Sequence, residues 1–148
     1  MESKIVRVTI QNYSLFQEMV VLRMTGNYEK SEYEPEDEIK RELLNPNFYL
    51  YAVQVDEWFV GWISLIYLPK VGRYQGHGHI YVDELWVHPQ YRRQGLAKAL
   101  LSKADELVQE LQATGVRLYV NEENPGAEAL YEKEGFHKVC RAYFMEKE

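Results

Sequence analysis

Cysteine is nearly absent from this chain of 148 residues, and it has no long apolar run. The single Cys140 cannot close a disulfide within one chain, which favours a reducing compartment, and we expect it to be a small buried hydrophobe near a C-terminal strand. The most apolar window, Trp58 to Leu68, is far shorter than the roughly 20 residues of a membrane span. The start Met1-Glu2-Ser3-Lys4 opens no apolar signal segment. These absences predict a cytoplasmic protein without a membrane partner.

Positive charge is also scarce, with 17 Lys and Arg against 23 Asp and Glu and a formal net charge of −6. Nucleic-acid binding needs a cationic surface that releases counterions, so we expect no nucleic-acid partner. Six acidic side chains gather between positions 29 and 38. They are Glu29, Glu32, Glu34, Glu36, Asp37 and Glu38. A solvated run that ends at a helix start is the favoured interpretation, and an acidic wall for a cationic ligand is the alternative.

Metal ligands are sparse as well. His77 and His79 flank a glycine, but no cysteine or clustered acid lies beside them, so we assign no metal.

Apolar residues make up 46% of the chain, which predicts one folded domain over 1–148. Apolar periodicity places alternating strands and helices along it. Expected strands cover 4–10, 48–55, 58–68, 80–87, 116–120 and 136–145. Expected helices cover 13–24, 36–44 and 96–111, with a short one from 125. Asp56-Glu57 is expected to turn a hairpin, and Ser14 is a possible helix cap.

The most informative segment follows the expected strand 80–87, where Pro89 ends the ladder. It reads Tyr91-Arg92-Arg93-Gln94-Gly95-Leu96-Ala97. Gly95 and Ala97 lie at the start of an amphipathic helix, whose first amides are unpaired and carry a partial positive charge. Small residues let an anion approach this backbone. Full positive charges come from Arg92, Arg93 and Lys98. The segment predicts a site for a phosphate or pyrophosphate.

A second segment lies one helix and one strand further on, and reads Asn124-Pro125-Gly126-Ala127, then Tyr131, then Gly135-Phe136. In this order, the two segments resemble the R/Q-x-x-G-x-G/A and N-x-x-A-x-x-x-Y-x-x-x-G-F signatures of the Gcn5-related N-acetyltransferases. The resemblance covers 81–136 well. It implies an α/β (α+β) acyl-CoA N-acyltransferase fold. Such a fold has a mixed, mostly antiparallel central sheet of about six to seven strands, flanked by about four helices.

The resemblance also implies a reaction. An acetyltransferase of this kind moves the acetyl group of acetyl-CoA directly to a primary amine, here an unidentified cationic small molecule or protein amine. Homodimers are common in the family. An acyl-CoA sensor or interaction module without catalysis is the alternative, although the retained Tyr131 argues against it. A nucleoside-triphosphate site is disfavoured because no Gly-Lys-Ser/Thr accompanies the phosphate segment.

The resemblance assigns the donor site residue by residue. Backbone groups of Leu85, Trp86 and Val87 would pair with the pantetheine arm as another strand does, and an N–H near Val87 would stabilise the oxyanion. Amides from Arg93 to Lys98 would hold the pyrophosphate. Asn124 would meet pantetheine, cap a helix, or do both. The implied acetyl-CoA ligands are Leu85, Trp86, Val87, Arg92, Arg93, Gln94, Gly95, Leu96, Ala97, Lys98, Asn124 and Tyr131.

Three side chains are predicted to move protons. Tyr131 would protonate the departing thiolate. A phenol with a pKa of about 10 can give a proton to this thiolate, whose conjugate thiol has a pKa of about 8.5, if it is placed beside it. Its alternative role is packing against Leu130. The acceptor ammonium must lose a proton to Asp83, to Glu84 or to water. Strand alternation sends these two carboxylates to opposite faces, and the family pattern favours Asp83. A solvated or substrate-anchoring carboxylate is the competing interpretation.

Overall fold

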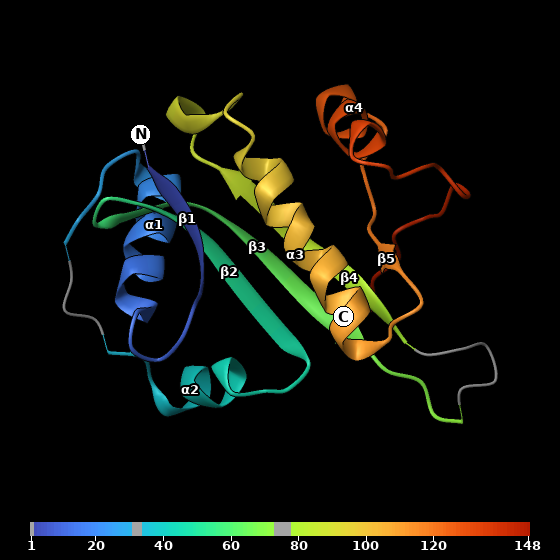
Figure 1. Cartoon of the computed structure of the whole chain (residues 1–148), viewed down its shortest axis with the longest axis horizontal. Coiled ribbons are helices and arrows are strands. Elements are labelled where there is room, and N and C mark those ends of the chain that lie inside the picture. The colour runs from blue at the N-terminus through green and yellow to red at the C-terminus, as the bar shows by residue number, and fades with distance from the viewer. Residues whose placement is uncertain (1, 31–33, 73–77) are drawn as a thin grey trace. The chain divides into compact units, whose positions relative to one another are not determined.

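The computed structural model describes residues 2–30, 34–72 and 78–148. It divides into two compact units, the first ending at Leu118 and the second spanning Tyr119–Glu148. Figure 1 shows the elements of both units in chain order by colour. The single domain over 1–148 stays a prediction.

The first unit is built on a five-stranded sheet in the order β1-β2-β3-β4-β5 (Figure 1). The strands are β1 (Ser3–Arg7), β2 (Phe48–Val55), β3 (Trp58–Leu68), β4 (His79–Val87) and β5 (Val116–Arg117). The pairs from β1 to β4 are antiparallel, and β4 pairs with β5 in parallel. The mixed, mostly antiparallel sheet is therefore confirmed. Its five strands among the described residues are fewer than the six to seven expected.

The helices of the first unit cover both faces of this sheet. They are α1 (Tyr13–Thr25), α2 (Asp37–Leu43) and α3 (Leu96–Leu111). Leu50 of β2 lines a pocket with residues of α1. The ring centre of the next residue, Tyr51, lies 5.7 Å from the Lys103 ammonium of α3. Successive strand residues point to opposite faces, so α1 and α3 lie on opposite sides of β2. With α4 (Pro125–Lys133) of the second unit, the four expected α-helices are present.

Two apolar layers result from this arrangement. On the α1 side, Met19, Ala52, Phe59 and Trp62 are almost fully buried together with Val8. On α3, the buried positions follow the three- and four-residue steps of an amphipathic helix, as the sequence predicts. They are Leu96, Leu100, Leu101, Ala104 and Leu107.

Helix boundaries follow local chemistry in most places. The Gly26 N–H donates to the Leu22 carbonyl at 2.7 Å and ends α1 with a left-handed φ of 84°. The expected cap at Ser14 is wrong, since the N-cap of α1 is Asn12. The Asn12 side chain does not cap the helix either, because its oxygen accepts from the Thr9 N–H at 2.7 Å.

β4 contains an irregularity that the sequence pattern did not show. Ser64 pairs with Glu84, but Leu65 pairs with Val82, so Asp83 is an extra residue without a partner on β3. Such a β-bulge shifts the alternation of all later side chains by one position. The simple period of two therefore does not run through β4.

The second unit contains α4 and the segment that follows it. In residues 119–148 no strand forms, so the expected strand over 136–145 is wrong, and the expected strand 116–120 ends at Arg117. Cys140 is exposed and not buried as expected. A β-prone segment orders only when a neighbouring strand satisfies its backbone groups and covers its apolar side chains. Here the apolar side chains are 85–95% exposed. They are Val139, Tyr143, Phe144 and Met145.

Across the described ranges, none of the helices combines the length and apolarity that crossing a bilayer requires.

Truncating the α3 core should destabilise the first unit. The Leu100 side chain is fully buried, whereas Leu44 is 71% exposed. We expect Leu100→Ala to lower the free energy of unfolding by about 2–5 kcal/mol, because it removes buried methyl groups and leaves a cavity. The control Leu44→Ala should change it by less than about 0.5 kcal/mol. Urea denaturation of both variants measures the difference, and equal losses would contradict the described packing of α3.

Candidate active site

Residues 93–98, between the short 3-10 helix η1 (Pro89–Tyr91) and the first turn of the next helix, have amides without backbone partners among the described residues. This 3-10 helix follows β4, and α3 begins at Leu96. Within the described ranges, no N–H from residues 93–98 donates to a backbone carbonyl, and the first N–H that does is that of Ala99. Arg93 and Gly95 have left-handed φ values of 62° and 77°. Left-handed residues in such a turn point neighbouring amides into one concavity, which suits an anion. We call residues 93–98 the anion loop.

Position 95 needs a glycine because of its backbone angle and not because neighbouring atoms leave no room for a side chain. A Cβ placed on Gly95 meets no atom within 4 Å, so the space in front of this backbone is open. Its φ of 77° strains any residue with a side chain. The glycine therefore sets the path of the chain into α3 and leaves room for a ligand.

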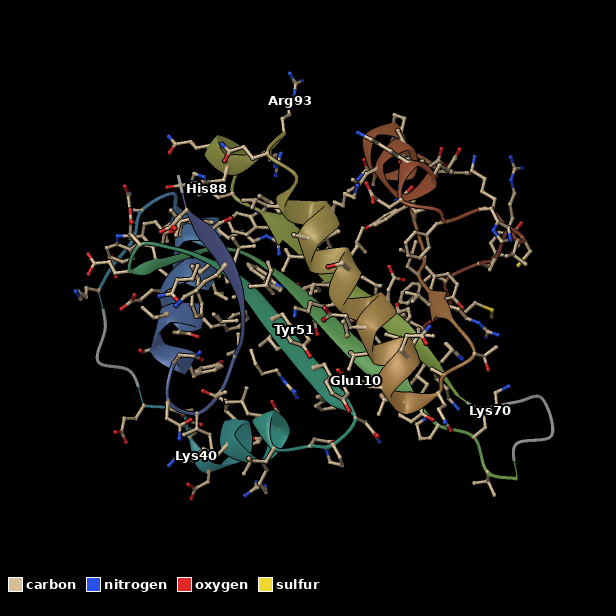
Figure 2. All side chains as sticks on the ribbon, viewed as in Figure 1. Lys40, Tyr51, Lys70, His88, Arg93 and Glu110 are labelled. Atoms are coloured by element: carbon tan, nitrogen blue, oxygen red, sulfur yellow. The ribbon has the colours of Figure 1, made fainter. Side chains whose placement is uncertain are left out.

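The two arginines of the motif have different positions. The Arg92 Nε donates to the Val87 carbonyl at 3.0 Å, so this side chain ties the loop back to the end of β4. Figure 2 shows the Arg93 side chain extending away from the sheet. Arg92 thus holds the loop in place, a role that the sequence pattern did not indicate.

One edge of β4 is unpaired beside the anion loop. β4 pairs with β5 only at Ile80 and Tyr81, and from Val82 to Val87 this edge has no strand partner in the part of the chain that the structure describes. We call this stretch the open edge. It leaves backbone donors and acceptors available for an extended ligand.

The pairing with β3 decides which backbone groups face the open edge. The His88 N–H donates to the Val60 carbonyl on β3 at 2.8 Å. Because antiparallel strands alternate their hydrogen-bonding side, Leu85 and Val87 turn their N–H and C=O groups to the open edge, and Trp86 turns its own to β3. The Arg92 contact with the Val87 carbonyl agrees with this direction. The open edge thus presents three backbone groups to a ligand: the N–H and C=O of Leu85 and the N–H of Val87.

A pocket of about 500 Å³ opens on the α1 side of the sheet. We call it the α1 pocket. It is lined by Phe16, Val20, Arg23, Met24, Leu50, Trp62, Ser64 and Glu84. Arg23 Nη1 lies 3.6 Å from Glu84 Oε2, and both side chains are about half exposed. Sequence reasoning missed Arg23. The signal was present, because Phe16, Val20 and Arg23 share one face of α1 at helical spacing and the third is charged.

The bulge at Asp83 decides which carboxylate enters the α1 pocket. Glu84 pairs with Ser64 and lies on the same face, in the pocket lining, whereas Asp83 is exposed and outside the lining. The family pattern had favoured Asp83 because relatives carry the base an even number of residues before the position of Val87. The structure brings Glu84, rather than Asp83, to the pocket.

Aromatic rings surround the end of β4. Trp86 packs on Trp62 at 5.1 Å between ring centroids, and on the other side it meets His88 at 6.0 Å. Burial, assisted by the Arg92 charge, lowers the pKa of His88, which stays neutral at pH 7. His88 Nδ1 accepts from the Gln90 N–H at 3.0 Å, so this histidine caps η1.

In the second unit, Asn124 caps α4. Its side-chain oxygen accepts from the Ala127 N–H at 3.1 Å, which confirms the capping interpretation of this motif residue. Tyr131 lies further along α4. The centre of its ring is 5.7 Å from that of Phe136, in an edge-on contact. Burial raises the pKa of Tyr131, so its hydroxyl keeps its proton at neutral pH. The ring therefore has a packing role within its own unit and also carries an available proton.

The described residues of the acidic run are not among those that line the α1 pocket. Glu36 is the N-cap residue of α2, and Asp37 and Glu38 are exposed in its first turn, as a solvated helix start requires. Glu32 and His77 lie outside the described residues. In the described ranges, no three His, Cys, Asp or Glu side chains gather in the way that a metal ion needs.

Comparison with known proteins gives the family context. The profile described as "Acetyltransferase (GNAT) family" matches residues 14–136. An acetyltransferase of Pectobacterium atrosepticum is 32% identical over 108 residues, which are 72% of this chain and 70% of that protein. The chloroplastic GCN5-related N-acetyltransferase 4 of Arabidopsis thaliana is 35% identical over 75 residues, 49% of this chain but 26% of that protein.

Solved structures agree on the fold. The structure of AAC(6')-Iy in complex with the bisubstrate analogue CoA-S-monomethyl-acetylneamine superposes with a TM-score of 0.80. The superposition covers 100% of this chain and 99% of that one, at 15% identity.

Removing the cap of α4 should loosen its first turn. We expect Asn124→Ala to speed hydrogen exchange of the Ala127 amide about fivefold, the equivalent of losing about 1 kcal/mol of capping. Asn124→Asp keeps an acceptor oxygen and serves as the control. Exchange that is equally slow in all three proteins would show that the cap does not hold this turn.

Proposed function

The chain belongs to the Acetyltransferase (GNAT) family, and we propose that it moves the acetyl group of acetyl-CoA directly to a primary amine. The observation that carries this proposal is the anion loop at the end of an open strand edge. A ligand with a pyrophosphate joined to an extended amide-bearing arm needs both features side by side. CoA has this chemistry, and the co-crystallised analogue of AAC(6')-Iy contains it.

The donor is held mainly by backbone groups in this proposal. The amides of the anion loop bind the pyrophosphate, with the Arg93 and Lys98 charges near it. The pantetheine amides pair with Leu85 on the open edge as a strand does. The Val87 N–H, which the Arg92 contact leaves free, donates to the thioester oxygen and stabilises the oxyanion. Asn124 contributes from the second unit.

Proton transfer completes the reaction. Glu84, which lines the α1 pocket, accepts the proton of the acceptor ammonium, with Asp83 or a water chain as the alternative route. The amine nitrogen then attacks the thioester carbon, and the tetrahedral intermediate collapses with cleavage of the C–S bond. Tyr131 gives its proton to the departing thiolate and regains one from the acetylated nitrogen, which ends as a neutral amide. A phenol keeps its proton at neutral pH, and burial raises the pKa of Tyr131 further.

The location and the oligomeric state are proposed from composition and surface exposure. A single cysteine suits the cytoplasm, which we propose as its location. We also propose a homodimer, in which the exposed apolar side chains between Val139 and Met145 are covered by a second copy. A sensor that binds acyl-CoA without turnover is the competing function, and release of free CoA in the presence of amines separates the two.

Closing the space in front of the anion loop should abolish donor binding. We expect Gly95→Glu to weaken acetyl-CoA binding by at least 100-fold, because a carboxylate then faces the pyrophosphate and strains the loop. Gly72→Glu is a matched control, since Gly72 has a φ of 76° and equally open surroundings away from the loop. Isothermal titration calorimetry measures both, and an unchanged affinity in Gly95→Glu would refute the assignment of the anion loop.

Removing the Tyr131 hydroxyl should slow turnover and spare binding. Tyr131→Phe keeps the ring contact with Phe136, so we expect kcat to fall about 10²–10⁴-fold while acetyl-CoA affinity stays unchanged. Tyr119→Phe, at a side chain that is 79% exposed and outside the proposed dimer surface, is the control. Pre-steady-state kinetics must show that chemistry limits the rate. A kcat within about threefold of the parent would exclude Tyr131 as the essential acid.

A further inference from the structure

The α1 pocket contains one cation and one anion side by side. Of the described residues that line it, only Arg23 and Glu84 are charged, and the other six are apolar, aromatic or a serine. The pocket is therefore electrically neutral and mainly apolar. This is unlike the acidic wall that the run at positions 29–38 had suggested as an alternative.

Arg23 is held over the pocket by packing as well as charge. Its guanidinium lies 5.1 Å from the centre of the Trp62 ring and 5.7 Å from that of Trp86. Cation–π contacts of this kind fix the direction of an arginine without using its hydrogen-bond donors. The Arg23 donors thus remain available at the mouth of the pocket.

The pair between Arg23 and Glu84 is loose. The separation of 3.6 Å exceeds the about 2.7–2.9 Å of a charge-assisted hydrogen bond. Both side chains are also half exposed, with 46% and 52% of their surface accessible. Half-exposed ion pairs contribute little stability, so a ligand that offers each partner a better contact can separate them.

We propose, on the basis of the acetyltransferase function above, that the acceptor is a free α-amino acid with an apolar side chain. Its ammonium contacts Glu84 and its carboxylate contacts Arg23, so each charge of the protein pair gains an opposite charge of the ligand. The side chain lies among Phe16, Val20 and Leu50. A volume of about 500 Å³ is within the usual range for a small-molecule site.

The reaction chemistry agrees with this placement. Glu84 takes the first proton from the ammonium, the nitrogen bonds to the acetyl carbon, the C–S bond breaks, and the thiolate takes a proton from Tyr131. The nitrogen then gives its second proton back to the Tyr131 oxygen, and Glu84 releases the first one to solvent. The product is an N-acetyl amino acid, which keeps its carboxylate but has lost its positive charge. Its contact with Glu84 is therefore weakened, and the Arg23–Glu84 pair can re-form and aid release. An amine without a carboxylate leaves Arg23 without a ligand partner, and a polyamine is repelled by it.

Matched acceptors test the proposal directly. The pairs are phenylalanine with 2-phenylethylamine and leucine with 3-methylbutylamine, each differing only in the carboxylate. With saturating acetyl-CoA and detection of free thiol, we expect kcat/KM to be at least tenfold higher for the amino acid of each pair. An advantage for the amine, no difference, or a preferred polyamine or aminoglycoside would overturn the proposal.

The Arg23 variants assign the preference to this side chain. Arg23→Met should lower kcat/KM for the amino acids about 10–100-fold, mainly through KM, and change it less than threefold for the amines. Arg23→Lys should recover part of the loss, and Arg41→Met, on α2 outside the pocket, should have no effect. An equal loss for amines and amino acids would refute the carboxylate contact. If Arg23→Met does not fold, the comparison of matched acceptors on the parent protein still decides.

The same experiment separates the two levels of the proposal. Thiol release with amines but without a carboxylate preference overturns the acceptor class alone. No thiol release with any member of a panel that also contains polyamines, aminoglycosides and peptide amino termini overturns the acetyltransferase function, and the acceptor with it.

Discussion

The parting of β4 from β5 is the constraint on which the proposed donor site depends. β4 and β5 share pairing only at Ile80 and Tyr81, after which β4 stays paired with β3 on one side and has no strand partner on the other among the described residues. A strand edge with unmet N–H and C=O groups is a liability unless something pairs with it. Here the unmet groups end at a loop whose own amides are also free. An extended ligand with an anionic end would satisfy both, and this is the chemistry of the donor proposed above.

The bulge at Asp83 has a comparable effect on the acceptor side. One extra residue moves Glu84 and Trp86 onto the face that α1 covers, where the Trp86 ring packs on Trp62. From Glu84 to Val87 the alternation is regular, so Glu84 shares a face with Trp86, whereas Val82, on the other side of the bulge, lies on the opposite face. Glu84 is therefore the carboxylate of β4 that lies within 3.6 Å of Arg23.

Neutrality of the pocket distinguishes this chain from a simple receptor for cations. Net charge and the acidic run describe the solvated surface, where individual charges are screened by water and salt. Recognition depends instead on the few charges that face a partly enclosed volume. In the α1 pocket these are one guanidinium and one carboxylate, and their balance, rather than the net charge of −6, sets what can bind.

The sequence alone determined the features that depend on near neighbours in the chain. Apolar periodicity predicts helix α3, and turn residues predict the hairpin of β2 and β3. The glycine and the helix start predict the anion loop, and capping chemistry predicts the role of Asn124. All of these act within a few residues. Tertiary structure decided the rest. The expected strand over 136–145 does not form because a strand needs a partner, the bulge at Asp83 arises from pairing with β3, and the Arg23–Glu84 pair joins α1 to β4. These features depend on contacts between distant segments, which no local pattern encodes.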